Sequence, residues 1–176
     1  MTELPLTLTQ ESPADAGAID RLHRRTFGPG RFARTAFRLR EQVPHDLSLS
    51  FTAYISSMMV GSVRLTPIAI GATPALLLGP LTVEPPFRSV GIGAHLMSVC
   101  MEAATAAGHR LILLVGDEAY YSRFGFKPVP HGNVTLPGPV DPARLLVAEL
   151  VPGAFNGVRG LTRGIAPIAG DHLQSA

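Results

Sequence analysis

An arginine and a pair of glycines stand between an apolar run and a helical run in the middle of the chain: Arg88 and Gly91-x-Gly93. The apolar run, 75–83, is short and stopped by two prolines, so it predicts a buried strand. The following run, 91–107, predicts a helix. The first N–H groups of a helix have no partner inside it, its dipole favours negative charge, and glycine lets a phosphate approach the backbone. The sequence therefore predicts an anion-binding turn, the alternative being a helix start that binds nothing.

The other residue types that commonly do chemistry give weaker signals. The six histidines do not have metal-ligand spacing. The one cysteine, Cys100, lies in the predicted helix and is expected to be a small buried residue. No pattern of nucleophile, base and orienting acid is evident. We therefore expect neither a metal site nor a covalent nucleophile.

Three predicted strands precede the turn. The run 48–56 alternates apolar and polar residues, which is typical of a half-buried strand, and 59–70 follows after a tight turn at Ser57-Met58. Together with 75–83 they predict an antiparallel meander. Proline cannot donate to a sheet ladder, so we interpret Gly79-Pro80 as a bulge where the third strand parts from its next neighbour and opens a slot in the sheet.

A strand–helix–strand unit follows. The continuous apolar run 110–115 is typical of a parallel strand covered on both faces, reached by a right-handed crossover. We then expect a short helix at 118–124, a strand from 126, a loop at 130–142 and a last strand at 144–150. At the N-terminal end the patterns predict a strand at 5–10, a helix from Ser12 to about Gly28, and a helix over about 31–42.

Length and composition indicate one globular domain. The 176 residues are 46% hydrophobic and 16% charged, which suits a sizeable core. We expect a domain over 1–150 and an extension of the same domain over 151–176, where no element is predicted. A net charge of +2 with scattered arginines does not indicate a nucleic-acid partner. No leader pattern and no spanning apolar run are found, so we expect a cytoplasmic protein without membrane contact.

Two motif blocks resemble those of the GCN5-related N-acetyltransferases (GNAT): Leu-x-Val-x-Pro-x-x-Arg-x-x-Gly-x-Gly at 81–93 and Tyr-Ser-Arg-Phe-Gly-Phe at 121–126. The chain is similar to small bacterial members of largely unassigned substrate. The resemblance implies an α/β fold with a mixed, mostly antiparallel central sheet and helices on both faces. It also implies a splay between two parallel strands, here 75–83 and 110–115, that binds acetyl-CoA as a co-substrate.

The resemblance assigns the contacts to acetyl-CoA. The backbone of Leu81 and Val83 is expected to pair with the pantetheine arm like an added strand. Arg88 begins the pyrophosphate site and adds positive charge. The cradle itself is expected to use six consecutive N–H groups, those of Ser89, Val90, Gly91, Ile92, Gly93 and Ala94. Many members have glycine at position 89; serine still supplies its N–H if its side chain points away.

Amide synthesis from a thioester needs a neutral amine, a donor for the developing oxyanion and a proton for the leaving thiolate. The N–H of Val83, left unpaired by the splay, is the expected oxyanion donor. Tyr121 has the position of the family's general acid, four residues before Gly125, and a phenol with a reference pKa of ~10 stays protonated. The alternative is a packing tyrosine, and spacing favours Tyr121 over Tyr120. Glu84 is either a base acting through water or a solvated loop carboxylate.

The acceptor is the least determined part. In the family, the two N-terminal helices border the acceptor site. Their arginines either contact an acidic acceptor or the phosphates of CoA, or form a solvated basic face, which we favour. They are Arg21, Arg24, Arg25, Arg31, Arg34 and Arg38. The predicted reaction is direct acetyl transfer to a primary amine of a small-molecule or peptide acceptor. The alternative is a module that binds acyl-CoA without turnover. The resemblance to the family also suggests a homodimer.

Overall fold

The computed structural model describes residues 5–28 and 35–165. Its centre is a mixed sheet in the order β1-β2-β3-β4-β5-β8-β6, with β9 beside both β3 and β7. The strands are β1 (Leu6–Gln10), β2 (Phe51–Ile55), β3 (Met58–Ile70), β4 (Thr73–Val83), β5 (Leu111–Val115), β6 (Lys127–Pro128), β7 (Val134–Thr135), β8 (Leu145–Glu149) and β9 (Gly160–Gly164).

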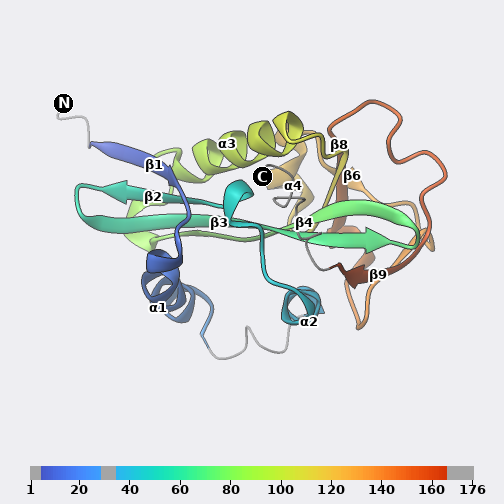
Figure 1. Ribbon diagram of the computed structural model, residues 1–176, viewed down its shortest axis with the longest axis horizontal. Coiled ribbons are helices and arrows are strands. Elements are labelled where there is room, and N and C mark those ends of the chain that lie inside the picture. The colour runs from blue at the N-terminus through green and yellow to red at the C-terminus, as the bar shows by residue number, and fades with distance from the viewer. Residues whose placement is uncertain (1–4, 29–34, 166–176) are drawn as a thin grey trace, which may run out of the picture.

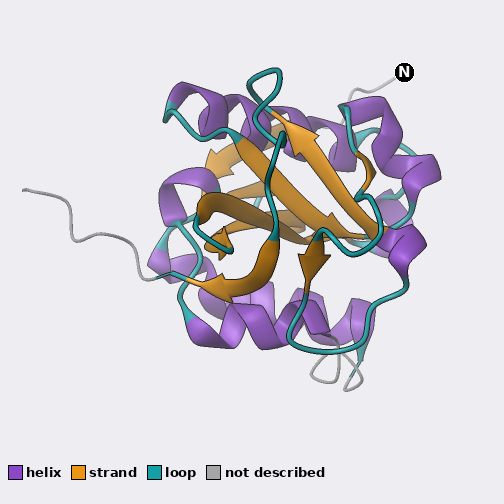
Figure 2. Cartoon of the chain, turned by 90° about the vertical axis from the view of Figure 1, so that its right-hand side faces the viewer, coloured by secondary structure: helices purple, strands orange, loops and turns teal. Residues whose placement is uncertain are grey.

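Helices cover both faces of the sheet. They are α1 (Ala16–Phe27), α2 (Thr35–Gln42), α3 (Ile92–Ala106) and α4 (Glu118–Tyr121). α3 lies on one face, and α1 and α2 lie on the other (Figure 1). The view from the side shows strands between two layers of helix (Figure 2). The predicted mixed, mostly antiparallel sheet with helices on both faces is confirmed. Within the described ranges, none of the helices is both long and apolar enough to cross a membrane.

The strands β2, β3 and β4 form the predicted antiparallel meander, and β1 extends it by pairing antiparallel with β2. Two boundaries differ from the prediction. The segment expected to begin a strand at 48 starts with a 3-10 turn, Leu47–Leu49. The turn between β2 and β3 is Ser56-Ser57 instead of Ser57-Met58, with Ser56 in a left-handed conformation (φ 53°). Both differences are local and leave the order of the strands unchanged.

β4 carries the predicted bulge. Two of its residues, Gly79 and Pro80, oppose the single residue Arg64 of β3. The extra residue shifts the alternation of side chains along β4. As a result, Leu78 before the bulge and Leu81 after it both pack in the cluster on the α3 face.

β4 and β5 separate just before this bulge. Their parallel pairing is limited to Leu76 with Ile112 and Leu77 with Leu113. β4 nevertheless runs on to Val83. The backbone of the last part of β4 therefore has an open edge toward β5, which confirms the predicted splay between two parallel strands.

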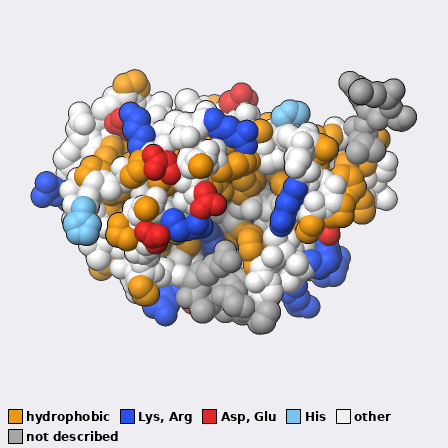
Figure 3. Space-filling model, turned by 180° about the vertical axis from the view of Figure 1, so that it is seen from behind, with side chains coloured by type: hydrophobic (Ala, Val, Ile, Leu, Met, Phe, Trp, Pro, Cys, Tyr) orange, Lys and Arg blue, Asp and Glu red, His pale blue; other side chains and the backbone are white. Residues whose placement is uncertain are grey.

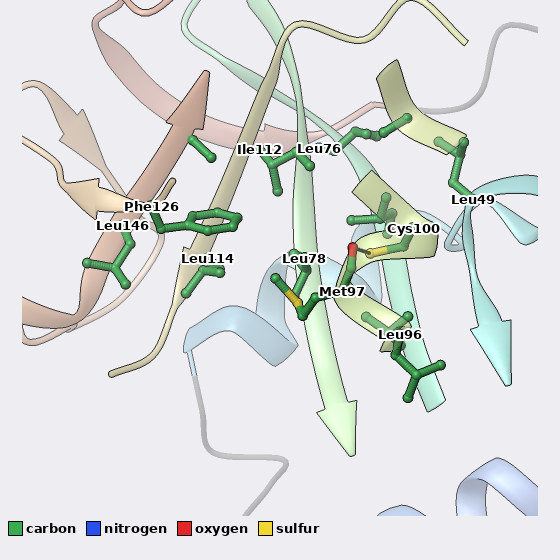
Figure 4. Packing of buried hydrophobic residues seen from close by; sticks show 14 of the residues in the cluster. Leu49, Leu76, Leu78, Leu96, Met97, Cys100, Ile112, Leu114, Phe126 and Leu146 are labelled. Carbon is green, nitrogen blue, oxygen red and sulfur yellow. Dashed lines mark hydrogen bonds between the residues drawn. The ribbon is translucent and has the colours of Figure 1, made fainter. Parts of the chain in front are cut away.

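Two apolar clusters hold the layers together. On the α3 face, Leu76 and Ile112 of the sheet and Phe126 pack with Met97 and Cys100 of the helix (Figure 4). The second cluster fills the α2 face and the region under the 129–158 segment. The parallel strands β4 and β5 contribute to both clusters, which explains their unbroken apolar sequence.

α3 buries a slightly different face from the predicted one. Ile92 and Leu96 are buried as expected, but Val99 and Ala103 are only half-buried. The other buried residues of the helix are Met97, Cys100 and Ala104. Apolar residues surround this helix, so the sequence leaves its rotation open and packing against the meander decides it. Burial raises the pKa of the Cys100 thiol to about 12, consistent with the predicted small buried residue.

The strand predicted as the last one, at 144–150, is β8, and it is not the last. β8 lies antiparallel between β5 and β6. β9 follows in the segment where no element was expected, and it pairs with residues 68–70 of β3 and with β7. β9 has no apolar run; it forms because β2 pairs with β3 only as far as Val63 and leaves the rest of that edge open. Residues 166–176 lie outside the described ranges.

Candidate active site

The predicted anion-binding turn lies at the N-terminal end of α3. The first helical hydrogen bond runs from the N–H of His95 to the carbonyl oxygen of Gly91 over 3.1 Å. The N–H groups of the three residues between them therefore point out of the helix end. Gly91 and Ser89 both have a left-handed backbone, with φ 87° and 79°, in an exposed turn. This conformation is the physical reason why glycine suits position 89; serine adopts it at a small cost.

The backbone of Val83 faces the splay. The N–H of Glu84 donates to the carbonyl of Val60 over 2.8 Å, while Val83 lies opposite Gly61. This makes Val83 and Gly61 a non-hydrogen-bonded pair, so the N–H and carbonyl of Val83 point away from β3 and toward β5. Leu81, two residues earlier, has the same orientation. The two residues expected to pair with pantetheine thus lie on the open edge of β4.

Tyr121 lies at the end of α4, packed against the end of β5. A Cβ on Gly116 would lie 2.5 Å from Cε2 of the tyrosine ring, so this packing needs glycine at 116. Burial raises the pKa of Tyr121 to about 12, and the nearby Tyr120 and Asp117 add to the rise. The phenol is therefore protonated at neutral pH and available as a hydrogen-bond donor.

Tyr120 reaches the other side of the splay. Its hydroxyl lies against the start of α3, where a Cβ on Gly93 would be 2.7 Å from the phenol oxygen. Its ring meets that of Tyr121 edge to face, with centroids 4.8 Å apart, and Arg123 covers it at 4.3 Å from the centroid. Sequence spacing favoured Tyr121 over Tyr120 as the general acid. Only the fold places Tyr120 next to the predicted pyrophosphate turn.

Glu84 is held by an ion pair. Arg25 of α1 donates from Nε to Oε1 over 3.2 Å and from Nη2 to Oε2 over 2.8 Å. Arg88, at the start of the turn, donates from Nε to the carbonyl of Val83 over 3.3 Å. Glu84 follows the predicted oxyanion donor in sequence, but among the described residues it does not belong to the lining of the main cavity.

The main cavity, about 890 Å³, runs from the splay to the α1–α2 face of the sheet. On the splay side it is lined by Leu81 and Tyr121, and α2 contributes Arg40. Residues 139–141 form another wall, which is tied to α2 by a hydrogen bond from the Thr35 hydroxyl to the carbonyl of Pro139. The sequence analysis did not single out Arg40, because a helical arginine carries no signal until the helix is docked.

A buried ionic network lies beside this cavity. The carboxylate of Glu11, 3% exposed, binds Arg64 through two hydrogen bonds of 2.8 and 3.2 Å. It also contacts Nε2 of His45 at 2.9 Å. Burial works against the charge of Glu11, but the hydrogen bonds of His45 and Arg64 outweigh it and hold the pKa of this carboxyl below its usual value. The network fixes the side chain of Arg64, which lines the cavity opposite the bulge.

The N-terminal arginines have separate environments. Arg24 and Arg25 each bind a carboxylate, over 2.7 and 2.8 Å. Arg38 is exposed and lies beside Gly138. Arg31 and Arg34 fall outside the described ranges. Figure 3 shows a face on which basic and acidic side chains lie intermixed around apolar surface, so its charge is not of one sign.

Comparison with known proteins agrees with this geometry. Residues 46–128 match the family model described as "Acetyltransferase (GNAT) domain". The uncharacterized N-acetyltransferase YhbS of Escherichia coli K12 is 31% identical over 153 residues, which are 86% of this chain and 91% of the relative. The chain belongs to the GNAT acetyltransferase family. A second relative, the uncharacterized N-acetyltransferase YjhQ of E. coli K12, is 27% identical over 143 residues, 79% of this chain and 78% of the relative.

Solved structures of GNAT proteins match the fold. The crystal structure of E. coli YhbS in complex with CoA has a TM-score of 0.79 and 27% identity, covering 94% of this chain and 92% of that chain. A GNAT acetyltransferase from Brucella melitensis in complex with acetyl-CoA has a TM-score of 0.60 and 26% identity, covering 88% and 100%.

Proposed function

We propose that this protein transfers the acetyl group of acetyl-CoA to a primary amine of its acceptor by direct attack. The observation that carries the proposal is the open edge of β4. There the amide of Val83 faces the splay, with Tyr121 packed on the β5 side. The exposed turn at 88–91 begins five residues after Val83. A thioester held along this edge has a donor for its carbonyl oxygen and another for its sulfur.

Binding of acetyl-CoA follows from the same elements. The N–H groups of residues 89–94 suit the pyrophosphate, because helix ends attract anions and the turn is exposed. The backbone of Leu81 and Val83 suits the amides of the pantetheine arm, which then extends β4 on its open side. The CoA and acetyl-CoA complexes of the similar E. coli and B. melitensis proteins support this assignment.

The chemical step forms one bond and breaks another. The amine nitrogen attacks the thioester carbonyl carbon, and the carbonyl oxygen takes up negative charge that the N–H of Val83 stabilises. The C–S bond then breaks, and the electron pair leaves with sulfur. The departing thiolate accepts a hydrogen bond from the hydroxyl of Tyr121 and takes its proton from solvent. The proton lost by the amine nitrogen passes to solvent or to a base, giving the amide and free CoA.

Glu84 remains a candidate base, but its geometry gives the role little support. Both of its oxygens already accept hydrogen bonds from Arg25. The side chain is 18% exposed and faces α1. Acting as a base would require the ion pair to open or a water to bridge from Oε2 to the amine.

The proposal is tested with the purified protein, acetyl-CoA and a panel of amines. We expect acetyl-CoA to bind, as measured by calorimetry, and free thiol to appear with at least one class of amine. Binding without thiol release for any amine would instead identify a module that senses acyl-CoA. Failure of acetyl-CoA to bind at all would contradict both readings.

A further inference from the structure

Arg40 stands at the junction between the splay and the rest of the main cavity. It comes from α2 and is half-buried. Its guanidinium lies against the bulge of β4, where a Cβ on Gly79 would be 2.6 Å from Nη2. Gly79 has φ 130°, a conformation in which glycine is strongly preferred. The absent side chain at 79 therefore makes the room in which this guanidinium approaches the splay.

The same guanidinium shares its surroundings with Tyr121. Both side chains line the one cavity, and the positive charge of Arg40 acts on the phenol of Tyr121. A group bound by Arg40 is therefore close to the point where the thioester sulfur is expected. The reacting amine of the acceptor must reach the same point.

Several other charged residues of this cavity have contacts within the protein. Arg64 binds Glu11, and Arg144 binds Asp117. The carboxylate of Asp141 accepts the backbone N–H of Ala143 over 2.9 Å. Arg40 differs from Arg64 and Arg144 in its position, because its guanidinium lies against the bulge of β4 beside the splay.

We propose that Arg40 binds a carboxylate of the acceptor, and that the acceptor is an α-amino acid. This inference rests on the acetyl transfer proposed above. In an α-amino acid one carbon separates the amine from the carboxylate. A guanidinium that holds the carboxylate through two parallel hydrogen bonds thus holds the amine within a few ångströms, beside the splay.

The positive charge has a second consequence for the reaction. A cation beside an amine disfavours its ammonium form, so Arg40 helps to supply the neutral amine that attacks. It also disfavours acceptors with a second cationic group near the amine. The site therefore discriminates in favour of amino acids and against polyamines.

The deciding experiment compares each standard amino acid with its α-carboxamide as acceptor, by thiol release from acetyl-CoA. The two differ only in replacing the carboxylate by a neutral group of the same shape. The amide also has the less basic amine, so any preference for the acid does not come from amine protonation. We expect kcat/KM for the preferred acid to exceed that of its amide by about 10²-fold or more.

Variants test whether the preference for the acid over its amide comes from the side chain of Arg40. Arg40→Gln should bring the acid-to-amide ratio near one while the Kd for acetyl-CoA stays close to the wild-type value, which also shows that the variant folds. Arg40→Lys should restore part of the ratio, since a lysine keeps the charge but loses the paired donors. Arg38→Gln, an exposed arginine of the same helix, should leave the ratio at its wild-type value.

Equal or better turnover of the amides would overturn the proposal, as would an unchanged ratio in Arg40→Gln. If acetyl-CoA binds but no acid or amide is turned over, the protein does not transfer acetyl groups to these acceptors. A binding measurement then tests whether Arg40 binds a carboxylate. In that case N-acetyl amino acids and their amides are titrated into the CoA-loaded protein. If the acids bind at least about tenfold more tightly than the amides, and Arg40→Gln abolishes this difference, the result supports the carboxylate site. Equal binding of acids and amides rejects it.

Discussion

Replacing Tyr121 by phenylalanine removes one hydroxyl and leaves a ring of the same shape on Gly116. The aromatic packing with Tyr120 and Phe126 does not involve that hydroxyl, so the variant should fold. The proposed loss is confined to the departing sulfur. We expect kcat to fall while the Kd for acetyl-CoA stays nearly constant, because the hydroxyl contacts the thiolate only as the C–S bond breaks.

The size of the effect follows from the environment of the phenol. The pKa of Tyr121 is about 12, whereas an alkyl thiol such as that of CoA resembles cysteine, with a reference pKa of ~8.5. The difference of about 3.5 units makes full proton transfer to a free thiolate unfavourable by roughly 5 kcal/mol. Tyr121 therefore acts mainly by hydrogen-bonding the developing thiolate. A hydrogen bond to a charged group contributes about 1.5–3 kcal/mol, so kcat should fall by roughly 10- to 150-fold.

The assay is thiol release under saturating acetyl-CoA near neutral pH, with calorimetry for the Kd. Tyr54→Phe is the matched control. The pKa of Tyr54 is also raised to about 12, by burial and by its hydrogen bond to Asp15, and Tyr54 does not belong to the cavity lining in the described part of the chain. A kcat for Tyr121→Phe within about threefold of wild type, or an equal loss in Tyr54→Phe, would refute the reasoning. The raised pKa further predicts no loss of kcat near pH 10 from ionisation of Tyr121.

Three further predictions test other parts of the molecule. Gly91→Glu should raise the Kd for acetyl-CoA by at least about tenfold, because it places a carboxylate in the phosphate turn; Gly108→Glu has the same left-handed backbone at the other end of α3 and should leave the Kd unchanged. Glu11→Gln should cost about 2–4 kcal/mol of unfolding free energy at pH 7, measured by urea denaturation, because Arg64 loses its buried partner. Since the folded pKa of Glu11 is lowered, its contribution is present above the ordinary value of 4.5 and is lost as the pH falls through the folded value; a Tm that falls equally in wild type and variant below pH 4.5 would contradict this. Glu84→Gln should lower kcat less than about tenfold, because the carboxylate is engaged by Arg25, and a loss of about 10²-fold or more would establish it as the base.

The central part of the fold could be predicted from the sequence because its signals are local. Apolar runs, the prolines after β4 and the glycines before α3 specify strand, turn and helix within a few residues of one another. The bulge at Gly79-Pro80 could be predicted because a proline cannot donate to the sheet ladder, so inside a strand it is found at an edge or a bulge. The rotation of α3 and the strand β9 were missed, since each depends on surfaces contributed by distant parts of the chain.

The candidate site divides in the same way. By itself the sequence determined the family resemblance and the residues expected to contact acetyl-CoA, because backbone N–H groups at a helix start and a tyrosine at fixed spacing are specified by neighbouring residues. Only the tertiary structure decided which side chains surround the acceptor cavity. Arg40 reaches the splay because α2 docks over a glycine of β4, and Arg64 is fixed by Glu11, 53 positions away in sequence. Such contacts join residues that share no local pattern, so they arise only when the sheet, the helices and residues 139–141 come together.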